Sequence, residues 1–265
     1  METSNQAPGT RHLIDTHAHL DSYSDVEEVI ERAAQAGVFK MIVAAFDLHC
    51  SRFNTKVVAD KDGLFASIGV HPHNAKDLDS EAKDELSDLA KEPKVKAIGE
   101  TGLDYHYLYS TKEVQKDAFK WHIELANKRG LPLIIHSREA LDETLEIMEQ
   151  EGFVKAGFVF HAFSGDMKQA EYIFEKGGLI SVTGVVTFKN ARDLQELIAE
   201  VDLGKIMLET DSPYLTPEPY RGKINEPANV KLVAEKVAAL KDLSIDEVAT
   251  TTTNTAENFF GIKKS

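Results

Sequence analysis

The chain has 265 residues, of which 42% are hydrophobic, and its formal net charge is −14. This length can bury one large core and lies near the roughly 250 residues of a (β/α)8 barrel, although length alone also permits two small domains. The acidic balance argues against a protein that coats nucleic acid through clustered Lys and Arg, but not against an enzyme whose cleft is made positive by bound metal ions. The single cysteine, Cys50, excludes an intrachain disulfide.

The N-terminal segment, residues 1–11, is polar and contains Pro8 and Gly9. It lacks the apolar core of a signal peptide, so we expect a flexible extension in front of a single domain over residues 12–265. The longest apolar stretches, such as residues 41–46, are far too short to cross a bilayer. We therefore expect a cytoplasmic protein with no membrane partner, present as a monomer or weak oligomer.

Eight short apolar runs, rich in Val, Ile and Phe, alternate with amphipathic stretches along the rest of the chain. Runs this short and this apolar are typical of strands that are buried on both faces. The runs cover residues 12–15, 40–46, 64–70, 95–99, 131–135, 157–160, 179–183 and 205–208.

The clearest helices are predicted at residues 25–36, 111–128, 230–241 and 244–260, and a proline-rich loop at residues 216–219. Ser24 and Ser110 can cap the first two helices, which end at Gly37 and before Gly130. Eight alternations of strand and helix predict a single closed parallel barrel. An open doubly wound sheet is the alternative, and the barrel is favoured because polar residues cluster just after most of the runs.

The first run leads into His17 and His19. Side chains two residues apart on a strand point to the same side, so both imidazoles face one point, as a metal ion would require. The pair by itself is also consistent with two ordinary polar histidines.

Later runs lead into Glu100, His136, His161 and Asp211. With the first two histidines, these side chains fall at the carboxyl ends of different strands, where barrel enzymes keep their active sites. Four imidazoles and two carboxylates exceed the needs of one tetrahedral ion and fit two divalent ions, with Glu100 as the candidate bridge. Mixed nitrogen and oxygen ligands suit Zn or Mn better than Mg.

Two acids follow the last run. Asp211 could both hold a metal ion and accept a proton from the attacking water. Glu209 points the same way and either contacts a further ion or positions its loop by hydrogen bonds.

Further polar side chains follow the third and fifth runs. Adding His71 and His73 as ligands would overfill the site, so His71 is expected to contact a phosphate oxygen or protonate the leaving group, and His73 to cap a loop. Arg138 can present its guanidinium group to a phosphate, or can pair with a helix acid such as Asp142.

The loop after Asp211 carries Tyr214, Arg221 and Lys223. Aromatic and cationic side chains beside a metal site suggest phosphate contacts and base stacking, although an ordinary surface loop could look the same. Ser164, after the sixth run, is a further candidate phosphate contact.

Seven segments between Ile14 and Val230 resemble the signature segments of the TatD family of DNases, in the family's order. They are IDTHAHLD, GVHPH, AIGETGLDYH, PLIIHSREA, FHAFSG, ISVTGVVTFK and LETDSPYLTPEPYRGKINEPANV. The resemblance implies a TIM barrel of the metallo-dependent hydrolase superfamily that acts as a divalent-metal nuclease on DNA. It implies the same six metal ligands, His17, His19, Glu100, His136, His161 and Asp211. Ile224 departs from the family pattern, because a basic residue is expected there.

These observations predict a deoxyribonuclease that hydrolyses phosphodiester bonds with two divalent ions, Mg, Mn or Zn. We expect exonuclease action on single-stranded or frayed DNA, because little basic surface remains for tracking a duplex. RNA stays open as an alternative substrate. The alternative is a metal-dependent amidohydrolase or esterase acting on a small cyclic amide or ester. A non-catalytic metal-binding or nucleic-acid-binding module is disfavoured by the intact ligand set.

Overall fold

Eight parallel strands form one sheet whose spatial order, β1 to β8, is the order of the chain. The computed structural model describes residues 12–263, so the extension expected at residues 1–11 lies outside the described residues. The strands are β1 Leu13–Ala18, β2 Val38–Val43, β3 Leu64–Ile68, β4 Val95–Asp104, β5 Leu133–Arg138, β6 Phe158–Phe160, β7 Leu179–Val182 and β8 Ile206–Leu208. All eight predicted runs are therefore strands.

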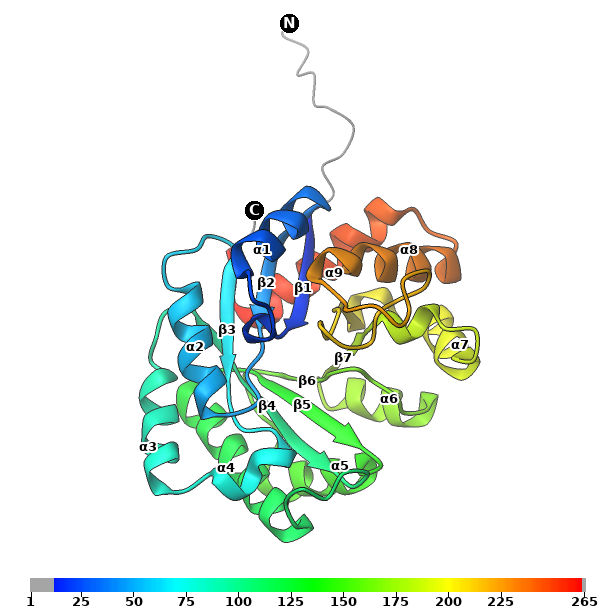
Figure 1. Ribbon diagram of the computed structural model, residues 1–265. Helices are drawn as coiled ribbons and strands as arrows, with labels where there is room; N and C mark the ends of the chain where they lie inside the picture. The colour runs from blue at the N-terminus through cyan, green and yellow to red at the C-terminus, as the bar shows by residue number, and fades with distance from the viewer. Residues whose placement is uncertain (1–11, 264–265) are drawn as a thin grey trace, which may run out of the picture.

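Helices follow the strands and surround the sheet (Figure 1). They are α1 Val26–Gln35, α2 Leu48–Val58, α3 Ser80–Leu89, α4 Lys112–Arg129, α5 Leu141–Glu151, α6 Met167–Glu175, α7 Arg192–Glu200, α8 Val230–Lys241 and α9 Ile245–Phe260. Within residues 12–263, none of them has the length and apolarity needed to span a membrane.

The sheet curls round until its last strand meets its first. The Thr16 hydroxyl in β1 donates a hydrogen bond to the Leu208 carbonyl in β8, at 3.0 Å. Beyond β8, the Asp211 amide donates to the His17 carbonyl at 2.9 Å, and the His19 amide donates to the Ser212 carbonyl at 2.8 Å. The arrangement is a (β/α)8 barrel, as predicted, and not an open doubly wound sheet.

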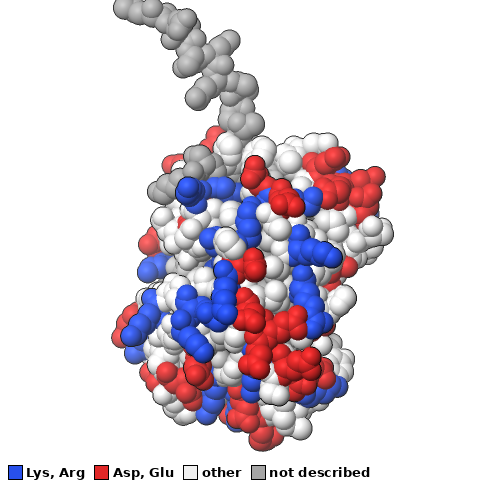
Figure 2. Space-filling model, turned by 90° about the vertical axis from the view of Figure 1, so that its left-hand side faces the viewer, with Lys and Arg blue, Asp and Glu red and all other residues white. Residues whose placement is uncertain are grey.

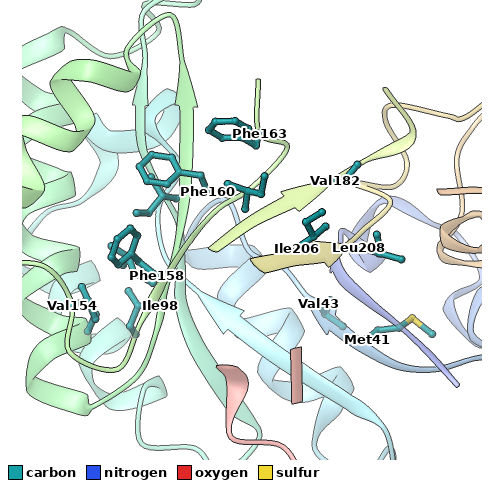
Figure 3. Close-up of a cluster of buried hydrophobic side chains, with 14 of the residues drawn as sticks. Met41, Val43, Ile98, Val154, Phe158, Phe160, Phe163, Val182, Ile206 and Leu208 are labelled. Atoms are coloured by element: carbon teal, nitrogen blue, oxygen red, sulfur yellow. The ribbon is translucent and has the colours of Figure 1, made fainter. Parts of the chain in front are cut away.

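Alternate residues of the strands belong to two separate hydrophobic clusters. One face, drawn in Figure 3 with Met41, Phe158 and Leu208 among its members, packs against the helices. The other face includes Ile42 and Met207 together with Ile14, Ala97, Ile134 and Val159, and it contacts Phe260 and Ile262 of the C-terminal segment. In a closed sheet the face away from the helices is the barrel interior, so the barrel is a packed core and the polar site is confined to its rim.

The N-terminal caps of two helices lie one residue after the predicted positions. Helix α1 begins at Val26, and its cap is Asp25, whose carboxylate accepts from the Glu28 amide, rather than Ser24. Helix α4 is likewise capped by Thr111 and not by Ser110. In both cases two neighbouring residues could cap, and the one in extended conformation directly before the helix does so.

Candidate metal centre

A cavity of about 790 Å³ lies at the carboxyl ends of the strands. Its lining includes residues from the last parts of β4 and β5 and from the segments that follow β1, β2, β3, β4, β6 and β8, which places it where barrel enzymes act. The lining residues are His19, Phe46, His71, His73, Asn74, Glu100, Tyr107, His136, Ser137, Arg138, His161, Ala162, Ser164, Asp211, Tyr214 and Leu215.

The buried Glu100 carboxylate stands among four imidazoles. Its Oε2 lies 3.2 Å from His17 Nε2. Its Oε1 lies 2.9 Å from His136 Nδ1, 3.4 Å from His161 Nε2 and 3.5 Å from His71 Nε2. Glu100 thus lies within 3.5 Å of a nitrogen atom in each of four histidines.

Asp211 stands on the other side of the first histidine pair. Its Oδ1 lies 3.4 Å from His19 Nε2 and 3.8 Å from His17 Nε2. Asp211 has a backbone φ of 54°, a left-handed conformation that is costly for a residue other than glycine. A hydrogen bond from the Asp211 backbone amide to the His17 carbonyl holds this conformation, which directs the carboxylate toward the histidine pair.

Strands β4 and β5 approach very closely beside Glu100 and His136. Gly102 has a φ of +142°, and a Cβ on this residue would lie 2.0 Å from the His136 carbonyl oxygen. The glycine therefore allows the two strands to bring their side chains to one place.

Hydrogen bonds on the far sides of the rings fix which imidazole nitrogens are free. His19 Nδ1 donates to the Ala44 carbonyl at 3.0 Å, so in the neutral ring Nε2 is the bare nitrogen, and it faces Asp211. His161 Nδ1 donates to Glu209 Oε1 at 3.0 Å, so in the neutral ring the bare Nε2 faces Glu100. A bare nitrogen and a carboxylate oxygen repel each other unless a cation or an added proton lies between them.

This donor set fits divalent metal ions. Three groups of side chains have ligand atoms that lie within 4.8 Å of one another. They are His17, His19 and Asp211; His17, Glu100 and His161; and His71, Glu100 and His136. The buried His17 also has an Nδ1 atom without a hydrogen-bond partner among the described residues. Imidazole and carboxylate ligands together suit Zn or Mn.

The close packing of carboxylates and imidazoles shifts the pKa values of both kinds of group. Burial would raise the pKa of Glu100, but the surrounding imidazoles, His161 foremost, hold its pKa well below the ordinary value. Burial would lower the pKa of His161, yet the carboxylates of Glu209 and Glu100 raise it to about 10. The centre thus holds negative carboxylates that attract positive charge.

Glu209 does not line the cavity. Its Oε1 accepts from His161 Nδ1 at 3.0 Å and from the Ala162 amide at 2.7 Å. A carboxylate behind a ligating histidine commonly fixes the orientation of the ring. Of the two roles expected for Glu209, these contacts favour positioning over binding a further ion.

His71 lines the same cavity. Its Nδ1 accepts a hydrogen bond from the His73 amide at 3.1 Å, so the proton of the neutral ring is on Nε2, which faces Glu100. Burial lowers the pKa of His71 well below the ordinary value, which favours this neutral form. His71 is therefore placed as a hydrogen-bond donor, although its distance from Glu100 would also permit ligation.

Asp104 is a further residue of the site that was not predicted from the sequence. Its Oδ2 lies 3.0 Å from both His136 Nε2 and His73 Nε2. Strand β4 continues past Gly99 to Asp104, so residues 100, 102 and 104 share one side of the strand. That period of two from Glu100 was the signal that could have identified Asp104.

The expected phosphate contacts separate into two sets. Arg138, Ser164 and Tyr214 line the cavity. Arg221 lies over the Phe188 ring at 4.1 Å, Lys223 Nζ lies 5.4 Å from the Tyr220 ring centre, and neither of these cations lines the cavity. The structure thus brings the metal-binding candidates together with Arg138, but leaves Arg221 and Lys223 outside the cavity wall.

Comparison with known proteins agrees with this geometry. A family model described as TatD related DNase matches residues 14–261. The chain belongs to this family. The TatD relative named uncharacterized metal-dependent hydrolase YabD, from Bacillus subtilis, is 40% identical over 253 residues, which cover 94% of this chain and 99% of that protein.

The fold of this TatD family member also matches solved structures. The crystal structure of YjjV, a TatD homologue from Escherichia coli K12, has a TM-score of 0.90 at 29% identity and covers 96% of this chain and all of that one. A protein from Citrobacter koseri named 3′-5′ ssDNA/RNA exonuclease TatD is 32% identical, covering 90% of this chain and 94% of that protein. The prediction of a TatD-family metal-dependent hydrolase with a TIM-barrel fold is confirmed.

Proposed function

We propose that this TatD-family hydrolase is a divalent-metal-dependent deoxyribonuclease that degrades single-stranded or frayed DNA from an end. The observation that supports this most is the composition of the cavity, where a metal-binding donor set shares its walls with Arg138. A guanidinium group suits the planar, bidentate recognition of phosphate. A small neutral amide or ester would have no use for it.

The residues that would hold two divalent ions are His17, His19, Glu100, His136, His161 and Asp211. Ions bound there would supply Lewis-acid activation of water and of a phosphoryl oxygen. Asp211 accepts the proton of the attacking water. Arg138 offsets the charge that develops on the phosphoryl oxygens, and His71 donates its Nε2 proton in a hydrogen bond to the phosphate or to the leaving oxygen.

The charge of the molecule supports end-directed action on unpaired strands. The face drawn in Figure 2 carries Lys and Arg interspersed with Asp and Glu, and the whole chain has a net charge of −14. Tracking a duplex needs many cation–phosphate contacts, which such a surface provides poorly. The name of the Citrobacter koseri relative includes exonuclease action on ssDNA and RNA, which supports DNA as substrate and RNA as a further one.

The test is hydrolysis of a 3′- or 5′-labelled single-stranded oligonucleotide by chelator-treated protein supplied with Mg, Mn or Zn. We expect metal-dependent shortening from one end, lost in Asp211→Asn and reduced at least about tenfold in Arg138→Ala. Arg221→Ala is the matched control, because it removes a cation outside the cavity wall. An intact oligonucleotide under every metal, from folded protein that binds ions, would favour amide or ester hydrolysis instead.

End-directed action has its own test. A circular single strand offers no end, so it should survive conditions that degrade the linear strand of the same sequence. Equal degradation of both would show endonuclease cutting and overturn this part of the proposal.

A further inference from the structure

Two tyrosines on the segment between β4 and α4 form an exposed aromatic surface. Tyr107 is 41% exposed and Tyr109 is 62% exposed. Their rings are parallel, with an interplanar angle of 1° and centroids 5.7 Å apart. We call this pair the tyrosine platform. Large aromatic surface left open to water at a site rim commonly marks a place where a partner binds.

The tyrosine platform is held in place by the residues behind it. The Tyr107 amide donates to Asp104 Oδ1 at 2.7 Å. The His73 ring meets both tyrosine rings at 86°, with centroids 5.7 Å from Tyr107 and 4.9 Å from Tyr109. Ser110 closes the segment by donating to the His73 carbonyl at 3.0 Å. The platform is therefore pre-organised, which lowers the entropy cost of binding a flat ligand.

The tyrosine platform is continuous with the candidate metal centre. Asp104, which holds Tyr107, also contacts His136. Tyr107 lines the same cavity as Glu100, and the Arg138 guanidinium lies 4.9 Å from the Tyr107 ring centre. Among the described residues that line this cavity, Arg138 is the one Lys or Arg. An aromatic surface, the Arg138 cation and the candidate metal ligands thus line the same cavity.

This sequence of groups matches the chemistry of an unpaired nucleotide. Bases of single strands stack on aromatic side chains while cations follow the backbone, and every base has a face that can stack. Bases inside a duplex are already stacked on their neighbours and cannot use such a surface. We propose that the tyrosine platform stacks an unpaired base of the substrate while Arg138 contacts the adjacent backbone phosphate. This inference rests on the proposed nuclease function and names the subsite that selects unpaired ends.

The test compares the wild type with a Tyr107→Ala/Tyr109→Ala double variant on a labelled single-stranded oligonucleotide. We expect KM to rise about tenfold or more, since the exposed aromatic surface is lost. Tyr107→Phe/Tyr109→Phe keeps both aromatic rings and should stay within about twofold of the wild type. Phe39→Ala removes an exposed aromatic, 40% exposed, that does not line the cavity, and should change nothing.

An abasic substrate separates stacking from general damage. The same oligonucleotide with abasic nucleotides at both ends should be a poor substrate for the wild type, and the double alanine variant should be no worse on it. An equal loss on normal and abasic strands would overturn the proposal, because the platform would then act through the metal centre or the fold. A change of oligomeric state in the alanine variant, without a change in KM, would assign the surface to protein contact and also overturn it.

Failure of the platform and failure of the nuclease function can be told apart. If the wild type cleaves the strand and the double alanine variant has an unchanged KM, the platform proposal is wrong and the nuclease proposal stands. If the wild type cleaves nothing, the nuclease proposal is wrong. Fluorescence anisotropy with the labelled strand then decides the platform, and an equal Kd for both proteins would overturn it.

Discussion

Asp104 binds two histidines through one carboxylate oxygen, and we expect this contact to set the metal affinity of His136. The Asp104 carboxylate fixes the proton of His136 on Nε2 and leaves Nδ1 facing Glu100. In Asp104→Asn, an amide nitrogen placed there would oppose the His136 and His73 protons. Metal affinity should fall about 10–100-fold, measured by calorimetric titration of chelator-treated protein. Asp142→Asn, which alters an exposed acid, should leave it unchanged, and an unchanged Kd in Asp104→Asn would refute the role.

His122 is a buried histidine outside the metal centre, and it should make the fold sensitive to acid. Its Nδ1 donates to the Ala118 carbonyl at 2.7 Å, and its Nε2 accepts from the Val70 amide at 3.0 Å. Burial lowers the pKa of His122 to about 4 from an ordinary value of 6.5. The unfolded chain therefore binds the proton more readily between these pH values, and stability is lost as pH falls from 6.5 toward 4.

The measurement is urea unfolding of chelator-treated protein at pH 6.5 and pH 5. His122→Gln is the variant, because its amide oxygen can still accept a hydrogen bond but does not titrate. The wild type should lose about 2 kcal/mol more of its unfolding free energy over this interval than the variant. Parallel losses in the two proteins would show that His122 does not titrate in this range.

At the scale of elements, the closeness of β4 and β5 is the feature most open to test. Gly102→Ala would place a Cβ 2.0 Å from the His136 carbonyl oxygen, so the strands must separate and carry Glu100 away from His136. We expect a loss of about 3 kcal/mol or more in unfolding free energy, with weaker metal binding. Gly177→Ala, at φ +82° with nothing near its Cβ, should cost only about 1–2 kcal/mol. Equal costs would show that backbone conformation, not crowding, requires Gly102.

The strands were predictable because each one is a short apolar run, which amphipathic helices do not produce. The continuation of β4 was not predictable in this way, because Glu100, Thr101 and Gly102 interrupt the apolar pattern where the strand enters the site. The six metal-binding candidates could be found because each follows an apolar run. Asp104 could not be found by that rule, because it does not follow an apolar run. It lies at the end of the part of β4 that was not predicted, residues 100–104.

The directions of the hydrogen bonds could not be predicted from the sequence either. Which nitrogen of His71 carries the proton depends on the His73 amide, and the orientation of Glu209 depends on the Ala162 amide. The same holds for Arg221, which packs on Phe188 although its place in the sequence suggested the cavity. Local spacing predicts which elements bear chemical groups, while tertiary contacts determine where those groups point.

At the scale of the whole molecule, the candidate metal centre connects the first strand of the barrel with the segment after the last strand. Its candidate ligands come from β1, β4, β5 and the segments after β6 and β8, including His17 on the first strand and Asp211 beyond the last. Ions bound between such distant parts of the chain stabilise the folded state and not the unfolded one, where the ligands are far apart. The free energy of metal binding is therefore expected to add to the unfolding free energy of the whole protein.

Removal of metal should consequently lower the melting temperature of the entire protein. An ion at a free concentration of about 100 times its Kd adds about 2.7 kcal/mol, which corresponds to roughly 5–11 °C for a chain of this size. Differential scanning calorimetry with excess Mn or Zn, and then with chelator, measures the shift. His17→Ala should show a smaller difference in melting temperature between metal and chelator than the wild type, because His17 belongs to two of the three groups of candidate ligands. A wild-type melting temperature indifferent to chelator would mean that these donors hold no ion, and the metal-dependent mechanism would then lose its physical basis.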